Sequence, residues 1–233
     1  CAAVFTFAGK TADAQQLKQC EKLLRSRERF FSEFRGNLRL IVLAKMALSD
    51  DPEVYWAHLR AVYCSFMKNR VFGEEYCLLA AIQLLEQMEP DRITEAVERT
   101  YAIHDRMRKA HPWLTGRGDL PMAAVLAVRK LIPEVLFEEM EACYQLLREK
   151  FHAGESAQIC SHVMSVSGAG AERKCSRMFA IWDGLKQNRH RYGTGKELAI
   201  LAALALLDRP TESIVRDILE ADEELSKKKG FGF

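Results

Sequence analysis

The sequence predicts an all-α protein, built as an α-solenoid in which antiparallel helix pairs of about 40 residues stack on one another. Apolar residues recur at helical spacing along most of the chain, and we find no alternating run of the kind that strands show. Five glycines also open successive units, with spacings of 37, 45, 36 and 41 residues: Gly36, Gly73, Gly118, Gly154 and Gly195.

A helix pair of this kind cannot bury its own apolar face, so several pairs must stack as one cooperative array. We therefore expect a single helical-repeat domain over residues 1–233. It divides into a partial unit, 1–35, and repeat units at roughly 36–72, 73–117, 118–153, 154–194 and 195–233.

The first elements can be predicted with their ends. Residues 3–10 are expected to be the tail of a helix, and residues 11–34 form a second one with Thr11 or Asp13 as its N-cap. An apolar helix over 37–48 follows, and its partner covers 53–72. Ser49 or Asp50 is expected to cap that partner, and Pro52 suits its first turn.

The later units repeat this order of a short apolar helix and a longer charged one. The expected pairs are 74–88 with 93–110, 119–131 with 135–151, 155–166 with 171–192, and 196–207 with 212–231. The first helix of each pair is apolar on most faces and should lie between its neighbours. The second is amphipathic and should form an outer layer with its polar face in water.

Bulky aromatic residues occupy matching places in the second helices. Those within the helices are Tyr63, Tyr101, Tyr144 and Trp182, and those that close the units are Phe72, Trp113, Phe151 and Tyr192. We expect the closing residues to pack into the groove left by the next unit.

The charge balance argues against a nucleic-acid-binding protein. The formal net charge is only +2, with both signs interspersed, whereas such proteins show a strongly basic face. One basic stretch, 186–196, is interpreted as a solvated helix end. A shared face for Lys186, Arg189, Arg191 and Lys196 with Arg173 and Arg177 would restore the nucleic-acid hypothesis.

The cysteines and the apolar runs point to a reduced, cytoplasmic protein without a membrane span. The chain has seven cysteines, none at the C-x-x-C spacing, and most lie at apolar helical positions. The longest uncharged apolar run, 198–207, is half of what a bilayer requires. The chain begins at Cys1 without the pattern of a signal peptide, which we interpret as a trimmed end.

No pattern indicates a catalytic residue, a metal site or a cofactor. The six histidines form no H-E-x-x-H pair, and His162 is expected to be a hydrogen-bonded core residue. The segment 193–196, GTGK, lacks the upstream glycine of a phosphate loop and is interpreted as a turn between helices. Carboxylates on the charged helices are interpreted as solvated.

Two junctions are less regular than the rest and supply the candidate binding residues. Arg35 and Asn37 flank the first opening glycine. The segment 111–121 is the longest link, and it gathers His111, Trp113, Arg117 and Asp119. The competing interpretation is structural: Trp113 fills the core, while His111 and Asp119 cap helix ends.

At these junctions the chain resembles a bacterial family, domain of unknown function 4003. The matching segments are FFSEFRGNLRL, HPWLTGRGDLPMAAVLA, WDGLK and the final KKKGFGF, and the likeness covers essentially the whole chain. The resemblance implies a cytoplasmic protein without an assigned activity, cofactor or catalytic residue. Members of the family are longer at both ends, so we expect this chain to lack an N-terminal segment and whatever follows Phe233.

These observations favour an interaction scaffold that binds a protein or peptide partner. The alternative is a small-molecule binder or enzyme that uses the segment 111–121, and the third hypothesis is a nucleic-acid-binding protein of the HEAT type. Apolar helices at the ends of the array would also permit end-to-end homodimers.

Overall fold

The computed structural model describes residues 2–68, 74–129, 131–152, 154–190, 192–193, 195, 197–228 and 230. Over these residues the regular elements are all helical, which confirms the predicted all-α class. The chain divides into two compact units, Cys1–Arg129 and Lys130–Phe233.

In the first unit, short apolar helices alternate with longer amphipathic ones. The elements are α1 (Ala2–Phe7), α2 (Ala14–Arg27), η1 (Glu33–Arg35), α3 (Arg39–Leu48), α4 (Pro52–Met67), α5 (Glu75–Gln87), η2 (Pro90–Arg92), α6 (Ile93–Ala110), η3 (Arg117–Asp119) and α7 (Leu120–Ala127). Helix α5 packs against α7 in one layer, and α4 packs against α2 and α6 in the other.

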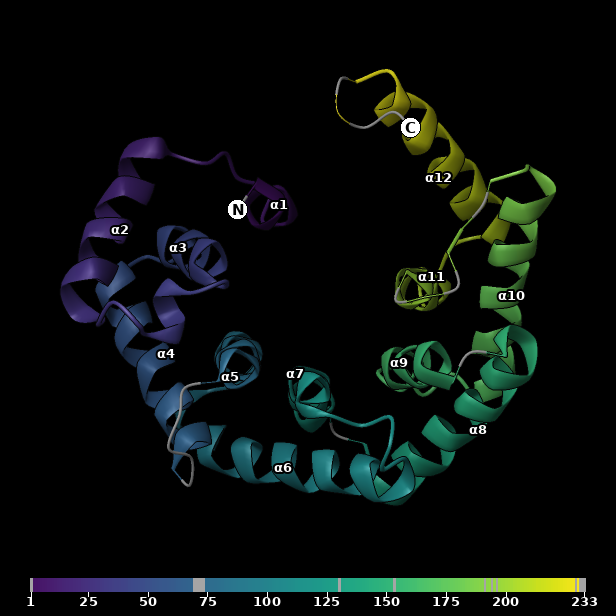
Figure 1. Ribbon diagram of the computed structural model, residues 1–233, viewed down its shortest axis with the longest axis horizontal. Coiled ribbons are helices and arrows are strands. Elements are labelled where there is room, and N and C mark those ends of the chain that lie inside the picture. Colours follow the sequence, from purple (N-terminus) through teal and green to yellow (C-terminus); the bar gives the residue numbers. More distant parts are fainter. Residues whose placement is uncertain are drawn as a thin grey trace. The chain divides into compact units, whose positions relative to one another are not determined.

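The two layers cross instead of running antiparallel. Within the first unit, Figure 1 shows α3, α5 and α7 nearly end-on, while α4 and α6 run across the view. The predicted antiparallel pairing is therefore wrong in its geometry. Small alanine side chains on the buried faces of α5 and α7 let crossed helices approach closely.

One predicted cap is confirmed and another is corrected. The Asp13 carboxylate accepts a hydrogen bond from the Gln15 amide, and Pro52 stands at the first turn of α4. The N-cap of α4 is Asp51, whose carboxylate accepts hydrogen bonds from the amides of Glu53 and Val54, and not Ser49 or Asp50. Ser49 ends α3 instead. The predicted helix over 11–34 stops at Arg27, and a separate 3-10 turn follows it.

The opening glycines mark junctions, but they do not have a single backbone role. Gly36 and Gly195 lie shortly before α3 and α11, Gly118 lies inside η3, and Gly154 is the first residue of α9. None of these four has a positive φ. Gly73 lies outside the described residues.

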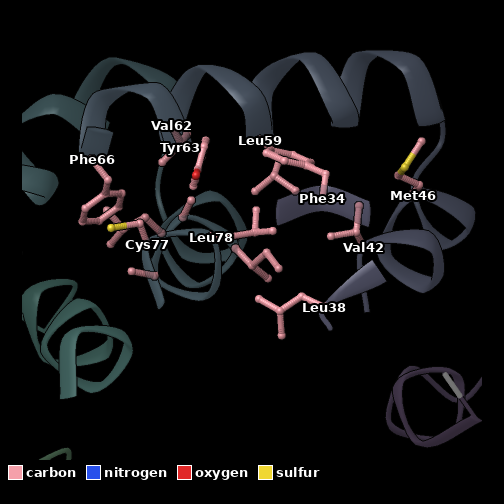
Figure 2. Packing of buried hydrophobic residues seen from close by; sticks show 14 of the residues in the cluster. Phe34, Leu38, Val42, Met46, Leu59, Val62, Tyr63, Phe66, Cys77 and Leu78 are labelled. Atoms are coloured by element: carbon pink, nitrogen blue, oxygen red, sulfur yellow. The ribbon is translucent and has the colours of Figure 1, made fainter. Parts of the chain in front are cut away.

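The core of the first unit forms where α3, α4 and α5 meet η1. Phe34 is fully buried and meets Tyr63 edge to face, with ring centroids 5.3 Å apart (Figure 2). Leu59 and Leu78 are buried beside them. Each such side chain contributes about 1.5–3 kcal/mol to folding.

The second unit has the same alternation of short and long helices. Its elements are α8 (Pro133–Phe151), α9 (Gly154–Met164), α10 (Ala171–Gln187), α11 (Leu198–Ala205) and α12 (Thr211–Ser226). Helix α9 packs against α11, and α10 packs against α8 and α12. Here too the short helices α9 and α11 are seen end-on and the long ones lengthwise (Figure 1).

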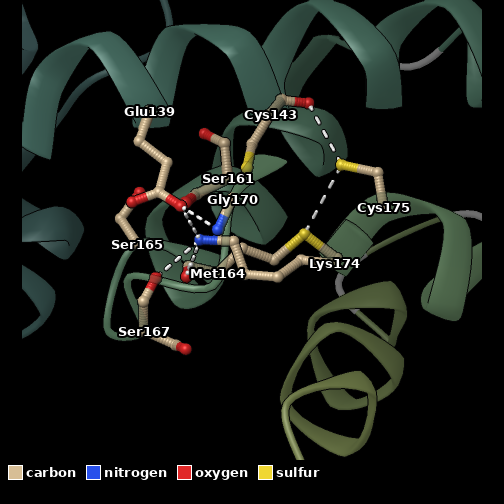
Figure 3. A network of polar contacts seen from close by, with 9 residues as sticks. All are labelled: Glu139, Cys143, Ser161, Met164, Ser165, Ser167, Gly170, Lys174 and Cys175. Atoms are coloured by element: carbon tan, nitrogen blue, oxygen red, sulfur yellow. Dashed lines mark hydrogen bonds and ion pairs between the residues drawn. The ribbon is translucent and has the colours of Figure 1, made fainter. Parts of the chain in front are cut away.

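A buried lysine joins three helices of the second unit. Lys174 of α10 is 1% exposed, and its Nζ donates to Glu139 Oε1 of α8 at 2.6 Å (Figure 3). The same ammonium donates to the carbonyls of Met164 and Ser167 at the end of α9. All three of its protons are therefore used, and carbonyls that a helix end leaves without partners are satisfied.

Arginines cap the short helices in both units. Arg177, the seventh residue of α10, donates to the carbonyls of Ala205, Leu207 and Arg209 at the end of α11. Arg99, the seventh residue of α6, donates to the carbonyl of Arg129, two residues beyond the end of α7. Cations at helix C-termini also complement the helix dipole.

The matched aromatic residues of the second helices are buried or half-buried. Tyr63 and Tyr144 lie in the core, and the Tyr101 hydroxyl donates to the carbonyl of Phe66 at 2.7 Å. Trp182 meets Phe151 edge to face. Tyr101 and Trp182 therefore each join two neighbouring long helices, α6 to α4 and α10 to α8.

Candidate interaction site

The turn after α6 folds back onto that helix through its own backbone. The His111 amide donates to Met107, and the His111 carbonyl accepts from the amides of Leu114 and Thr115. The buried Thr115 hydroxyl donates to the Met107 carbonyl at 3.2 Å. The C-terminal end of α6 and the first half of the turn are thus held as one piece.

Gly116 is held on both sides in the second half of the turn. Its amide donates to Asp119 Oδ2 at 2.8 Å, and its carbonyl lies 2.8 Å from His104 Nε2. His111 is the C-cap of α6, and Asp119 stabilises the start of η3. Both residues therefore have the structural roles that the competing interpretation assigns to them.

Trp113 projects from this turn into water. It is 97% exposed, so the prediction that it closes a unit or fills the core is wrong. The turn buries Thr115 instead, which leaves the indole on the outer side. Among the other closing residues, Phe151 packs on Phe179 and Trp182, and Tyr192 is half-buried. Phe72 lies outside the described residues.

Two predicted site residues from distant parts of the chain meet at the start of α5. Arg117 Nη1 lies 3.2 Å from Glu74 Oε1, and Asn37 Nδ2 donates to Glu75 Oε2 at 3.0 Å. We call the group of Asn37, Glu74, Glu75 and Arg117 the α5 junction. The sequence singles out Asn37 and Arg117 but not the two carboxylates that bring them together.

The α5 junction is acidic on the side that faces η1. Burial raises the pKa of Glu33, and the nearby carboxylates of Glu75 and Glu74 raise it further. The Glu74 amide donates to the Tyr63 hydroxyl at 3.2 Å, and burial is the main cause of the raised pKa of that tyrosine. The junction thus rests on the core and holds more negative charge than Arg117 neutralises.

Arg35 does not join the α5 junction. Its Nη1 donates to the Glu28 carbonyl at 3.3 Å, and its guanidinium lies 5.3 Å from the centre of the Phe30 ring. The Glu28 carboxylate is buried and accepts from Ser32 and the Trp56 indole. Arg35 and Asn37 therefore face different neighbours although one residue separates them.

The sequence interpretation does not single out Lys174, which is buried, and it is wrong in treating Glu139 as solvated, since that side chain is mostly covered. Lys174 lies among Ala171, Cys175 and Met178, which form the buried face of α10. A lysine on the apolar face of an amphipathic helix is the signal that could have found it. The carboxylate that it meets comes from another helix, and spacing along the chain does not reveal it.

The basic stretch of 186–196 is only partly described, because Arg191, Thr194 and Lys196 lie outside the described residues. Lys186 lies 5.3 Å from the centre of the Trp182 ring, whereas Arg177 is turned toward the end of α11. Arg177 therefore caps the C-terminal end of α11. The GTGK segment at 193–196 likewise falls partly outside what is described.

In the part of the chain that the structure describes, no three His, Cys, Asp or Glu side chains lie together in a way that could hold a metal ion. His162 is buried, as expected. Over the same residues, no helix combines the length and the hydropathy needed to cross a bilayer.

Comparison with known proteins identifies the family of this chain but assigns no activity to it. Residues 1–233 match the family described as protein of unknown function, DUF4003. The chain belongs to this family. It is also 24% identical over 177 residues to the uncharacterized protein YeaA of Bacillus subtilis (strain 168), an alignment that covers 73% of this chain and 51% of the relative. The chain thus spans about half the length of that relative, and no solved structure matches it.

Proposed function

We propose that this protein is a helical-repeat scaffold that binds a protein or peptide segment, with Trp113 as the anchor. The observation that carries the proposal is a fully exposed indole on a turn that is fixed by hydrogen bonds. Tryptophan dominates the energetic centres of protein interfaces because it buries a large area. A turn whose backbone is already ordered loses little backbone conformational entropy when it binds.

The charges around Trp113 support an acidic partner. The segment 104–119 has four basic and two acidic side chains: Arg106, Arg108, Lys109 and Arg117 against Asp105 and Asp119. Arg117 contacts Glu74 and is outweighed by the carboxylates of the α5 junction, so the positive excess near Trp113 comes from Arg106, Arg108 and Lys109. We therefore propose a partner segment in which an apolar side chain that packs on the indole is flanked by Asp or Glu.

The scaffold proposal includes the α-solenoid, a single repeat domain and a cytoplasmic location. The arginine caps that Arg99 and Arg177 supply to two short helices support a repeated unit. A single cooperative transition in calorimetry, seen alike by all probes, would support one domain. Among the described cysteines, which are all free, five are buried, and this supports a reducing compartment.

A peptide selection tests the proposed anchor. A displayed random peptide library is selected on the full chain, and the selected peptides are titrated against Trp113→Ala and against Phe31→Ala, which removes another exposed aromatic ring. We expect acidic peptides with one large apolar residue, weakened about 30-fold by Trp113→Ala. Phe31→Ala should leave their affinity unchanged. Peptides that bind the Trp113→Ala protein as tightly as the wild type would refute the anchor.

The two other functions have less support. Asp119 and His104 are both engaged with Gly116, so a small-molecule or enzyme site in 111–121 would have to use groups that shape the turn. Arg177 is committed to the end of α11, which removes one cation from the proposed nucleic-acid face.

A further inference from the structure

The second unit contains a cavity at the C-terminal end of α10, well away in sequence from the Trp113 turn. It measures about 600 Å³, within the size range of small-molecule sites, and is lined by Trp182, Lys186, Arg189, His190 and Tyr192. The lining thus combines three aromatic rings with two permanent cations. Such a combination suits a ligand that is both flat and negatively charged.

The two permanent cations of the cavity have few competing partners. Within the described residues Arg189 forms no ion pair, and Lys186 contacts only the face of the Trp182 ring, 5.3 Å from its centre. His190 Nδ1 lies 3.5 Å from Asp222 Oδ2, and burial together with the nearby Glu197 carboxylate raises the pKa of the Tyr192 hydroxyl. A phosphate that entered the cavity would meet an ammonium and a guanidinium, the two groups that bind phosphate best.

The aromatic lining offers flat surfaces at fixed positions. The Trp182 ring is held edge to face by Phe151, with centroids 5.5 Å apart, and its Nε1 is buried without a hydrogen-bond partner in the described structure. The rings of His190 and Tyr192 lie 6.2 Å apart. A base that stacks on such rings gains about 1–3 kcal/mol.

Arg189 has a backbone conformation that favours glycine. Its φ is 60°, and it follows α10 in a C-terminal turn closed by the hydrogen bonds Arg189 N to Lys186 O and His190 N to Leu185 O. Glycine is the usual residue at such a position because other side chains are strained there. The chain nevertheless has an arginine here, and its side chain lines the cavity.

We propose that this cavity binds a mononucleotide, with the base against the aromatic rings of the lining and the phosphate between Lys186 and Arg189. The site lies on helix α10 of the second unit and does not depend on the proposed peptide anchor in the first. A ligand of this class uses each feature of the lining: the flat rings, the paired cations and the volume.

The strained backbone supplies a test variant that should not damage the fold. Calorimetric titration of the full chain with AMP, adenosine and inorganic phosphate measures the separate contributions of base and phosphate. We expect AMP to bind at least tenfold more tightly than either fragment. Arg189→Gly should weaken AMP at least tenfold while the unfolding midpoint stays the same or rises, because glycine relieves the strain.

His152→Gly is the matched control. His152 also has a positive φ of 54°, at the end of α8, so the change relieves the same kind of strain away from the lining of the cavity. It should leave AMP affinity unchanged. Equal AMP affinity of Arg189→Gly and wild type, adenosine binding as tight as AMP, or no heat at millimolar AMP would each overturn the proposal. If a single-stranded hexanucleotide bound more than tenfold more tightly than AMP, the ligand of the cavity would be single-stranded nucleic acid and not a mononucleotide.

Discussion

Lys174 and Glu139 form a buried ion pair, 2.6 Å from Nζ to Oε1, at the point where α8, α9 and α10 meet. The glutamate also accepts from the Gly170 amide, and the lysine also binds two carbonyls at the end of α9. Both charges are thus compensated by several partners, as a low-dielectric interior requires. The pair fixes how three helices of the second unit pack together.

Removing the lysine should destabilise the protein strongly. Lys174→Met leaves the Glu139 carboxylate buried without its counter-charge and two carbonyls without a donor. We expect a loss of about 3–5 kcal/mol in the free energy of unfolding, measured by urea denaturation. Lys150→Met is the control, since Lys150 pairs with Asp183 at 3.0 Å in a much more exposed position. That change should cost less than about 1 kcal/mol, and equal costs would show that the buried pair has no special role.

Loss of the Arg177 guanidinium should loosen the end of α11. Arg177→Met keeps the aliphatic stem but removes hydrogen bonds to three carbonyls. We expect about 2 kcal/mol of destabilisation, less than the sum of the three bonds because the carbonyls regain water. Hydrogen exchange should increase in residues 198–205 before the rest of the unit. Arg173→Met, on an exposed position of the same helix, should change neither quantity.

The raised pKa of Glu33 predicts a pH-dependent stability. Because its folded-state pKa lies above the ordinary value of 4.5, the folded state binds the proton more tightly than the unfolded state does. Glu33 therefore lowers stability as the pH rises from about 4.5 through the raised pKa. Glu33→Gln should increase the unfolding midpoint at pH 7 and leave it nearly unchanged at pH 4. A midpoint gain that is the same at both pH values would contradict this cause, and Glu98→Gln on the exposed face of α6 controls for charge removal.

Local features of this fold could be predicted from the sequence because they depend on neighbours along the chain. Helical spacing predicts the long helices, Asp13 is one of the two predicted caps of α2, and Pro52 is predicted in a first turn. Each of these features is determined by side chains within a few residues.

The features that were missed depend on contacts between distant segments. Trp113 is exposed because Thr115, two residues later, takes the buried place in the turn, whereas apolarity alone favours burial of the tryptophan. The candidate site was half predicted: Asn37 and Arg117 were identified, but the α5 carboxylates that they contact were not. Crossing of the helix layers likewise depends on tertiary packing, which spacing does not encode.

Helices α10 and α12 approach closely at Gly184, and the effect of Gly184→Ala on stability should depend on whether Val215 is present. A Cβ at Gly184 would lie 3.0 Å from Cγ2 of the buried Val215. Gly184→Ala gains helix propensity, worth about 1 kcal/mol, but it overpacks this contact, which costs about 1–3 kcal/mol. We therefore expect Gly184→Ala to destabilise the wild type.

In a Val215→Ala background the same change should stabilise, because the Cγ atoms that it meets are gone and only the propensity gain of about 1 kcal/mol is left. The free energies of unfolding of the four proteins form a double-mutant cycle, with an expected coupling of more than about 1 kcal/mol. Gly168→Ala is the control, because a Cβ there meets no heavy atom within 4 Å. A steric clash with Val215 must disappear when the valine is replaced. If Gly184→Ala changed the free energy of unfolding by the same amount in both backgrounds, the close packing of α10 on α12 would therefore not depend on this glycine.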